Sequence, residues 1–578
     1  MAQPDLTTIH SYLVTLYGES IGDLAFERLR AILTPYLNEP SSKEGNEILS
    51  ERDSILITYA NQLKEPHVRP FQSLSSFCEK YLSGLVSGIH VLPFFPHFSD
   101  NRFSIINYQA VKSTVGKWED VSRLGSKFRL MFDAVINHVS VHHEWFQAFL
   151  RDATNYRNYF IVVNGEPDLS AVVRPNALPL LTEFNTRSGR RQVWTTFSAD
   201  QVDLNFQNPH VLLEIVDTLL FYVDYGAQLI RLDAAAYLWK EIGTPCIHLP
   251  QTHTLIKLLR AVLDVVAPHV LLIAETNFPH QDNLSYFGDG CDEAHMVYNF
   301  ALPPLVLHAF QTGNSHALSN WAADLKLPSR YTTFFNFLAS QDGIGIHPVR
   351  GILSEREIAA LAERTTQHGG LVSYKDGPDG TPIPHELNIN YFDALSDPRT
   401  SEPLNVQVDR FMAAQAIMLA LIGVPGIYFH SLFGSRGWRA GVDLTGRNRT
   451  INRQKLDLAA FESELADETS LRHQVFHRYE QLLRVRSASS AFHPHGGQQV
   501  LDCGDAIFAL LRRSPDESQS VLCLHNVSDQ PQPVTADWKD VFHSSSSSLI
   551  DLITLMDVPS NGDLVLKPYQ ILWLRMKK

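Results

Sequence analysis

A series of short, almost wholly apolar segments, separated by helical stretches, most limits what this chain can fold into. Parallel strands are covered on both faces, so their sequences are nearly continuous apolar runs. Seven such runs, with a weaker eighth at AHMVYNFA (294–301), give the count of a (β/α)8 TIM barrel, an α/β fold. The seven are ILITYA (55–60), GIHVLPF (88–94), LMFDAVI (130–136), AQLIRLDA (227–234), VLLIAET (270–276), TTFFNFLA (332–339) and VPGIYFH (424–430).

Polar residues gather where these runs end. Barrel enzymes assemble their sites from residues at the C-terminal ends of the strands, so this placement predicts a catalytic site. The residues concerned are Asn61, Asp133, Arg231, Asp233, Glu275 and Asp342.

The 578 residues are too many for one compact domain, and the pattern divides them. We predict an N-terminal helical extension over 1–50 and a catalytic barrel over 51–485. Two long insertions, about 106–204 (subdomain B) and 343–402 (a lid), are expected to build substrate-binding walls. Short alternating segments over 486–578 predict a C-terminal antiparallel β domain.

Composition narrows the function. A formal net charge of -14 argues against nucleic-acid binding, which needs clustered Lys and Arg. Neither a signal peptide nor a membrane span is predicted, so we place the chain in the cytoplasm. Five scattered cysteines, without CxxC spacing, predict free thiols rather than a disulfide framework or a zinc site. They are Cys78, Cys246, Cys291, Cys503 and Cys523.

Two strand-end carboxylates fit one kind of chemistry. Cleaving a glycosidic bond with retention needs a nucleophile and an acid/base carboxyl group about 5–5.5 Å apart. Asp233 in IRLDA and Glu275 in IAET follow successive strands. Arg231 lies on the same strand face as Asp233 and favours its ionised form, whereas burial favours a protonated Glu275. A single carboxylate at a strand end is more often structural, so the ordered set carries the prediction.

The order of four motifs resembles the α-amylase family, glycoside hydrolase family 13. They are DAVINH (133–138), IRLDA (230–234), IAET (273–276) and SQDG (340–343). Further segments, GTPCIHLP, YNFALPPLVLHAF and RTINR, resemble the sucrose phosphorylase subfamily. Within it, RGIL, HGGLVSYK and HELNINYFDALSD are most similar to the glucosylglycerate phosphorylases.

The resemblance implies a covalent glycosyl intermediate on Asp233, formed with help from Glu275 and intercepted by inorganic phosphate. Asp342 matches the third family carboxylate. The implied acceptor is glycerate or a similar polyol acid, with sucrose phosphorolysis as the alternative. The predicted substrate-binding residues are Asn61, Tyr108, His138, Arg174, Arg231, Tyr237, Gln341, His385, Glu386 and Arg449.

Several positions depart from the subfamily pattern. Asn61 stands where the subfamily usually has Asp, and Gln341 replaces the usual His. Both changes fall on the donor-sugar side. On the acceptor or phosphate side, Asn176 lies near the position where sucrose phosphorylases have a second Arg. His385 stands where a Tyr is common in the subfamily.

These departures leave three alternatives to an unchanged phosphorylase. They are a changed donor sugar, a hydrolase or transglycosylase that uses the same intermediate, and a catalytically weak sugar-binding relative. Arg350 and Lys375, on the second insertion, either face an acidic acceptor or remain solvated. We predict no cofactor and no metal. The predicted partners are a small sugar and inorganic phosphate, with no nucleic acid and no membrane, and a homodimer is left open.

Overall fold

The chain closes a barrel of eight parallel strands within the residues that the computed structural model describes, which are 5–37, 49–98, 102–176, 178–376, 381–535, 541–542, 548–559 and 564–577. Each predicted apolar run forms one strand, and neighbours in the barrel are neighbours along the chain. The predicted (β/α)8 fold is therefore confirmed. The strands are β1 (Ile55–Tyr59), β3 (Gly88–Leu92), β4 (Arg129–Ala134), β10 (Ala227–Leu232), β11 (Leu271–Ala274), β12 (Met296–Tyr298), β13 (Thr333–Asn336) and β17 (Val424–Tyr428).

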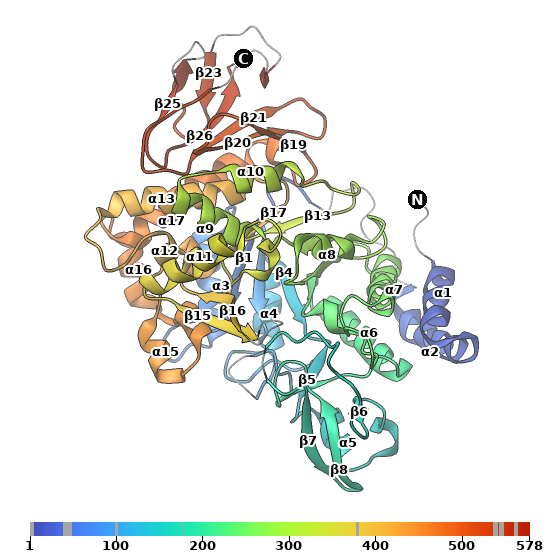
Figure 1. Ribbon diagram of the computed structural model, residues 1–578. Coiled ribbons are helices and arrows are strands. Elements are labelled where there is room, and N and C mark those ends of the chain that lie inside the picture. The colour runs from blue at the N-terminus through green and yellow to red at the C-terminus, as the bar shows by residue number, and fades with distance from the viewer. Residues whose placement is uncertain are drawn as a thin grey trace.

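Helices between the strands pack on the outside of the barrel (Figure 1). The sequence of α6 explains why a helix forms there and packs on the barrel. The Asn208 side chain caps its N-terminus, Pro209 occupies its first turn, and its apolar face is buried. The barrel interior is packed tightly, because a Cβ at Gly426 of β17 would lie 2.4 Å from the Phe335 ring. The main outer helices are α3 (Pro70–Tyr81), α4 (Trp118–Gly125), α6 (Pro209–Asp224), α7 (Pro250–Val266), α9 (Leu302–Thr312), α13 (Leu404–Ala420) and α17 (Leu471–Ser487).

Shorter elements complete the barrel surface. They are the helices α8 (His280–Leu284), α10 (His316–Ala323), α12 (Tyr391–Leu395), α14 (Phe429–Leu432), α15 (Arg439–Thr445) and α16 (Leu458–Ala466), and the paired strands β2 (Leu63–Lys64) and β18 (Leu456–Asp457).

Two N-terminal helices, α1 (Leu6–Tyr17) and α2 (Glu19–Leu37), lie beside α6 and α7 (Figure 1). Their apolar positions, among them Ile9 and Leu29, are buried. The Tyr17 hydroxyl donates to the Phe206 carbonyl at 2.9 Å. Apolar burial and this hydrogen bond attach the extension to the barrel; residues 1–4 and 38–48 of the predicted 1–50 segment lie outside the described residues.

The first insertion carries its own small sheet, which extends away from the barrel (Figure 1). The fully buried Trp194 anchors it, with its indole N–H donated to the Thr196 hydroxyl at 3.1 Å. Among the described residues its elements are β5 (His138–Ser140), α5 (Glu144–Leu150), β6 (Val162–Val163), β7 (Leu181–Thr186), β8 (Gly189–Trp194) and β9 (Gln201–Asp203), with the sheet order β6-β8-β7.

The second insertion also contributes a sheet. Its helix α11 (Glu355–Gln367) begins with a capping box, in which the Ser354 hydroxyl and the Glu357 carboxylate each accept from the other's backbone N–H. In the described part, β14 (Ile344–Gly345), β15 (Leu371–Asp376) and β16 (Pro382–Asn388) pair in the order β14-β16-β15. Residues 377–380 of the glycine-rich run, predicted to be a lid, lie outside the described residues.

The C-terminal segment forms an antiparallel sheet, as predicted. Within the described residues its strand order is β19-β20-β21-β26-β23-β24. Their bounds are β19 (Gly497–Leu501), β20 (Ile507–Arg513), β21 (Ser520–Asn526), β23 (Ser548–Asp551), β24 (Asp557–Pro559) and β26 (Ile571–Met576), with β22 (Gln532–Pro533) pairing with β25 (Val565–Leu566) beside them.

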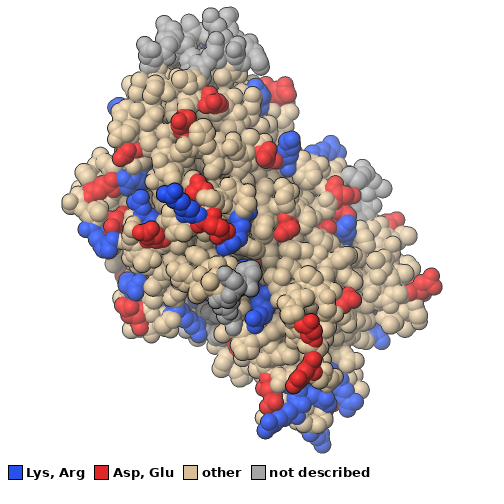
Figure 2. Space-filling model, viewed as in Figure 1, with Lys and Arg blue, Asp and Glu red and all other residues tan. Residues whose placement is uncertain are grey.

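Acidic and basic side chains are interspersed over the face shown in Figure 2. Of the helices in the described ranges, none is both long and apolar enough to cross a membrane.

The buried guanidinium of Arg486 on α17 links the barrel to the chain around it. Burial lowers the pKa of this group to about 10, and its N–H groups are donated to backbone carbonyls from distant segments. Those carbonyls belong to Glu51, Asp53, Leu419, Gly423 and Phe492.

Replacing this side chain should destabilise the whole barrel. We expect Arg486→Met to cost about 2–4 kcal/mol, because it leaves several buried carbonyls unpaired. The midpoint of thermal unfolding, measured by circular dichroism, should fall by several degrees. Arg484→Met on the same helix, which removes an exposed pair with Glu480, is the control and should have little effect. Equal midpoints for the two variants would contradict the assignment.

Candidate active site

A single guanidinium joins three carboxylates at the C-terminal ends of adjacent barrel strands. Arg231 of β10 donates from Nη1 to Asp133 Oδ1 at 2.6 Å and to Asp233 Oδ1 at 2.8 Å. Its Nη2 lies 3.4 Å from Glu275 Oε1. The predicted nucleophile and acid/base residue therefore meet at one cation.

Arg231 is itself held in place by Asp133, which in turn contacts His90. His90 Nε2 lies 2.8 Å from Asp133 Oδ2, and both side chains are fully buried. Burial alone would raise the pKa of Asp133, but His90 and Arg231 outweigh it and hold the pKa below its usual value. Asp133 is thus ionised and holds Arg231 in place. The sequence alone did not distinguish this positioning role from direct contact with a substrate.

Burial shifts both central carboxyl groups upward. The pKa of Asp233 is raised to about 6 by burial, although Arg231 opposes the shift. The pKa of Glu275 is raised to about 7, by burial first, with Arg231 opposing and the Asp233 charge adding to it. Glu275 also accepts a hydrogen bond from the Ala234 N–H at 2.9 Å. As the pH falls through this range, Glu275 takes up its proton before Asp233 does.

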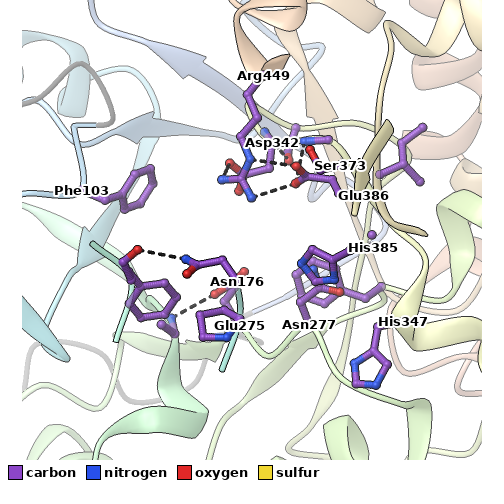
Figure 3. Close-up of a pocket in the computed structure, with 18 of the residues that line it drawn as sticks. Phe103, Asn176, Glu275, Asn277, Asp342, His347, Ser373, His385, Glu386 and Arg449 are labelled. Carbon is purple, nitrogen blue, oxygen red and sulfur yellow. Dashed lines mark hydrogen bonds and ion pairs between the residues drawn. The ribbon is translucent and has the colours of Figure 1, made fainter. Parts of the chain in front are cut away.

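A second arginine organises the opposite side of the site. Arg449 Nη1 lies 2.7 Å from Asp342 Oδ1, and its Nη2 lies 2.8 Å from Glu386 Oε1 (Figure 3). Arg453 Nη2 approaches the same Asp342 oxygen at 3.4 Å. The Gln341 amide donates to the other oxygen of Asp342 at 3.1 Å. Asp342 is held by two arginines of the RTINR segment and by its neighbour Gln341.

Between these two networks lies a cavity of about 470 Å³. Figure 3 shows Arg449, Asp342 and Glu386 on one side, and Glu275 with Asn176 on the other. Its described lining includes most of the predicted site: His138, Arg174, Asp233, Tyr237, Glu275, Asp342, His385, Glu386 and Arg449.

Basic side chains line the end of the cavity formed by the second insertion. His347, Lys375 and His385 all face it. Burial, and then the charges of Lys375, His385 and Arg350, lower the pKa of His347 to about 4. Burial and the Arg350 charge also lower the pKa of Lys375. Burial is the larger cause of both shifts, and the smaller contribution of the neighbouring charges reflects the basic groups gathered at this end, which fit an anionic ligand.

Two nitrogens at this end have no hydrogen-bond partner within the described residues. They are His385 Nδ1 and Arg350 Nη2, both buried. Arg350 uses its other terminal nitrogen to pair with Glu355 at 2.9 Å. Of these two residues only His385 lines the cavity, so its unpaired nitrogen fits a bound ligand there, because buried polar groups are rarely left unpaired.

Four remaining predicted residues do not line the cavity. Arg231 is buried behind it and contacts the carboxylates instead of facing the cavity. The Tyr108 hydroxyl is buried and donates to the Val135 carbonyl at 2.8 Å, so a sugar contact through it is not supported. Asn61 Oδ1 accepts from Arg102 Nη2 at 2.5 Å. Gln341 reaches the cavity only through Asp342. For each, a neighbouring polar group already occupies the side chain.

Several residues that line the cavity are not among those predicted from the sequence. Arg453 closes the RTINR motif four residues after Arg449, so the motif itself was an available signal. Asn277 follows IAET directly, and its buried Oδ1 has no partner among the described residues. Phe103 and His347 come from loops without a pattern, and only the fold brings them to the cavity.

Comparison with known proteins explains this arrangement. The family described as the α-amylase catalytic domain matches residues 79–334. A glucosylglycerate phosphorylase from Spirochaeta thermophila is 48% identical over 97% of both chains. The chain belongs to the glucosylglycerate phosphorylase family. Another member, from Escherichia coli, is 46% identical over 91% of this chain and 92% of its own. The family resemblance predicted from the motifs is confirmed.

A solved structure of similar fold extends over nearly the whole chain. The sucrose 6F-phosphate phosphorylase from Thermoanaerobacter thermosaccharolyticum aligns with a TM-score of 0.72 at 23% identity, covering 91% of this chain and 99% of that one. At this identity the likeness concerns the fold.

The coupling of the two central carboxyl groups can be tested without substrate. We expect Asp233→Asn to lower the pKa of Glu275 from about 7, because a neighbouring negative charge that disfavours ionisation is removed. Infrared titration of the protonated carboxyl band would measure it. Asp342→Asn, whose charge acts less strongly on Glu275, should lower the pKa by less. An unchanged or raised pKa in Asp233→Asn would contradict the pairing.

Proposed function

We propose that this chain is a retaining glycoside phosphorylase, a hexosyltransferase that reversibly phosphorolyses a small α-glycoside of glycerate or a similar acid. The observation that carries the proposal is the shared contact of Asp233 and Glu275 with Arg231. Membership of the glucosylglycerate phosphorylase family supports it. Both substrates, the sugar and inorganic phosphate, fit a cavity with a cationic end.

The proposed reaction proceeds by two displacements. In the first, a carboxylate oxygen of Asp233 attacks the anomeric carbon. The bond between that carbon and the acceptor oxygen breaks at the same time. Glu275 gives its proton to that oxygen, and the acceptor leaves. In the second, a phosphate oxygen attacks the same carbon, its proton passes to Glu275, and Asp233 leaves as a carboxylate. Two inversions give an α-sugar 1-phosphate.

Asp342 and Arg449 have a supporting part in this proposal. The developing positive charge on the sugar ring is stabilised by the Asp342 carboxylate, which Arg449 and Arg453 orient. His138 lies close by, with Nε2 2.8 Å from the Phe103 carbonyl, and lines the donor side. Tyr237 is placed on the acceptor side.

A hydrolase or transglycosylase remains the second candidate, because one observation favours it. The Asn176 amide is donated to the Phe197 carbonyl at 2.9 Å, so it is already used within the first insertion. Phosphate binding then depends on Arg174 and on the basic side chains of the second insertion that line the cavity. Phosphate release in the synthetic direction separates the two candidates, since a hydrolase releases it without an acceptor.

Two further parts of the proposal concern the protein as a whole. A cytoplasmic location is supported by five free cysteines, four of them buried. A homodimer stays a prediction, which light scattering on the purified protein would test.

The roles of the two carboxylates are separable with a fluoride donor. Fluoride leaves without protonation, so we expect Glu275→Ala to retain kcat/KM for an α-glycosyl fluoride within tenfold, yet to lose about 10²–10⁴-fold on the natural glycoside. Asp233→Ala should lose both activities, because the nucleophile is needed in either case. Fluoride release and phosphorolysis assays measure the two rates. Wild-type rates in Asp233→Ala would remove the nucleophile assignment.

The acceptor end makes a different prediction. Lys375→Met should raise KM for glycerate about tenfold or more in the synthetic direction, while KM for glycerol as acceptor changes little, because only glycerate carries a charge. Phosphate release from the α-sugar 1-phosphate measures both. Lys326→Met, remote in the sequence and outside the cavity lining, is the control. Parallel changes for both acceptors would show that Lys375 does not recognise the carboxylate.

A further inference from the structure

The ring of Tyr59, at the C-terminal end of β1, is in contact with two cations. The Arg102 guanidinium carbon lies 4.3 Å from the ring centroid, and the Lys455 ammonium lies 3.6 Å from it. Arg102 also donates to the Asn61 amide oxygen at 2.5 Å. The side chain that Arg102 contacts here is therefore the neutral amide of Asn61. The subfamily usually has a carboxylate at this position.

Lys455 lacks a counter-charge within the described part of the chain. Its ammonium is buried and has no hydrogen-bond partner there. Burial lowers the pKa of Lys455 well below its usual value, and the charges that act on it most strongly, those of Arg102, Arg453 and Lys64, are all positive. A buried ammonium without an anion is costly, so an anion bound here would stabilise the charged form of Lys455.

Arg102 is held in an unusual conformation beside it. Its φ is 58°, in the left-handed region that favours glycine, and such strain concentrates at functional sites. The next residue, Phe103, lines the cavity, as does Arg453 (Figure 3). The cations thus lie directly behind a wall of the cavity, on the side of Asp342.

The barrel order defines which part of a substrate faces this wall. β1 stands four places from β11 in the ring of eight described strands, so the two are diametrically opposite. Glu275 follows β11, and the anomeric carbon of a bound sugar must lie near it. The far side of the sugar ring, formed by C4 and by C5 with its C6 branch, therefore points toward β1.

We propose that the donor subsite takes a sugar with an anionic group at C6, a carboxylate, sulfonate or phosphate, recognised by Arg102 with Lys455. This inference rests on the proposed function for the position of the anomeric carbon. It accounts for Asn61, because a carboxylate at that position would repel such a donor. The anion of such a donor would also favour the protonated form of Lys455.

Binding to the Asp233→Ala variant tests the inference without turnover. Calorimetry compares α-glucose 1-phosphate with α-glucuronic acid 1-phosphate, 6-deoxy-6-sulfo-α-glucose 1-phosphate and α-glucose 1,6-bisphosphate. These probes share the anomeric phosphate and differ at C6. We expect at least one anionic probe to bind tenfold tighter or more, and the tightest identifies the anion. Equal or weaker binding of all three would overturn the inference.

Variants then assign the recognition to the named residues. In the same background, Lys455→Met and Arg102→Gly should each reduce the preference for the anionic probe about tenfold, with α-glucose 1-phosphate bound within threefold of before. Lys127→Met, an exposed lysine just before β4 at the opposite end of the barrel, should change neither. A uniform loss for charged and neutral probes would instead indicate a structural role. Arg102→Gly relieves a strained residue, so it decides the question if Lys455→Met fails to fold.

Turnover separates this inference from the proposed function. A strong preference for an anionic probe, without acceptor-dependent phosphate release from any donor, would refute the phosphorylase and leave the donor subsite standing. Full-rate release from α-glucose 1-phosphate with glycerate, without tighter binding of any anionic probe, would refute the anionic donor subsite. It would leave the proposed phosphorylase standing.

Discussion

The contact of Arg231 with Asp133, Asp233 and Glu275 is the interaction on which the rest of the site depends. One guanidinium cannot neutralise three buried carboxylates, even with His90 beside Asp133. The excess of negative charge and the loss of water raise the pKa values of Asp233 and Glu275 to about 6 and about 7. A proton held by one carboxyl group and not by the other follows from that imbalance, and double displacement needs such a difference.

The barrel makes this arrangement stable. Closing eight strands fixes Arg231 on β10 and Asp233 just after it beside Glu275 after β11, with Asp133 on β4 behind them. Each position is set by the hydrogen-bond register of a strand and not by a flexible loop. The cost of burying these charges is met by packing and backbone hydrogen bonding over the whole barrel, including the carbonyls that Arg486 binds.

The two long insertions determine what such a core acts on. Arg449 bridges Asp342 of the barrel and Glu386 of β16, which joins the second insertion to the donor side. The same insertion brings His347, Lys375 and His385 to the other end of the cavity. Electrostatics therefore differ along the cavity: carboxylates gather at the ends of the barrel strands, and basic side chains gather at the end that the second insertion forms.

The sequence by itself determined the barrel and the carboxylates at its rim, since apolar runs must become buried strands and polar residues at their ends must meet at one rim. It also determined the family, because four short motifs recur in a fixed order. Only the tertiary structure decided which polar side chains reach the cavity. Tyr108 donates to a backbone carbonyl and Asn61 accepts from Arg102, whereas Asn277, His347 and Phe103 line the cavity from connecting segments with no periodicity. The physical reason is that a strand's pattern fixes the direction of its side chains, while a loop's contacts depend on segments far away in the sequence.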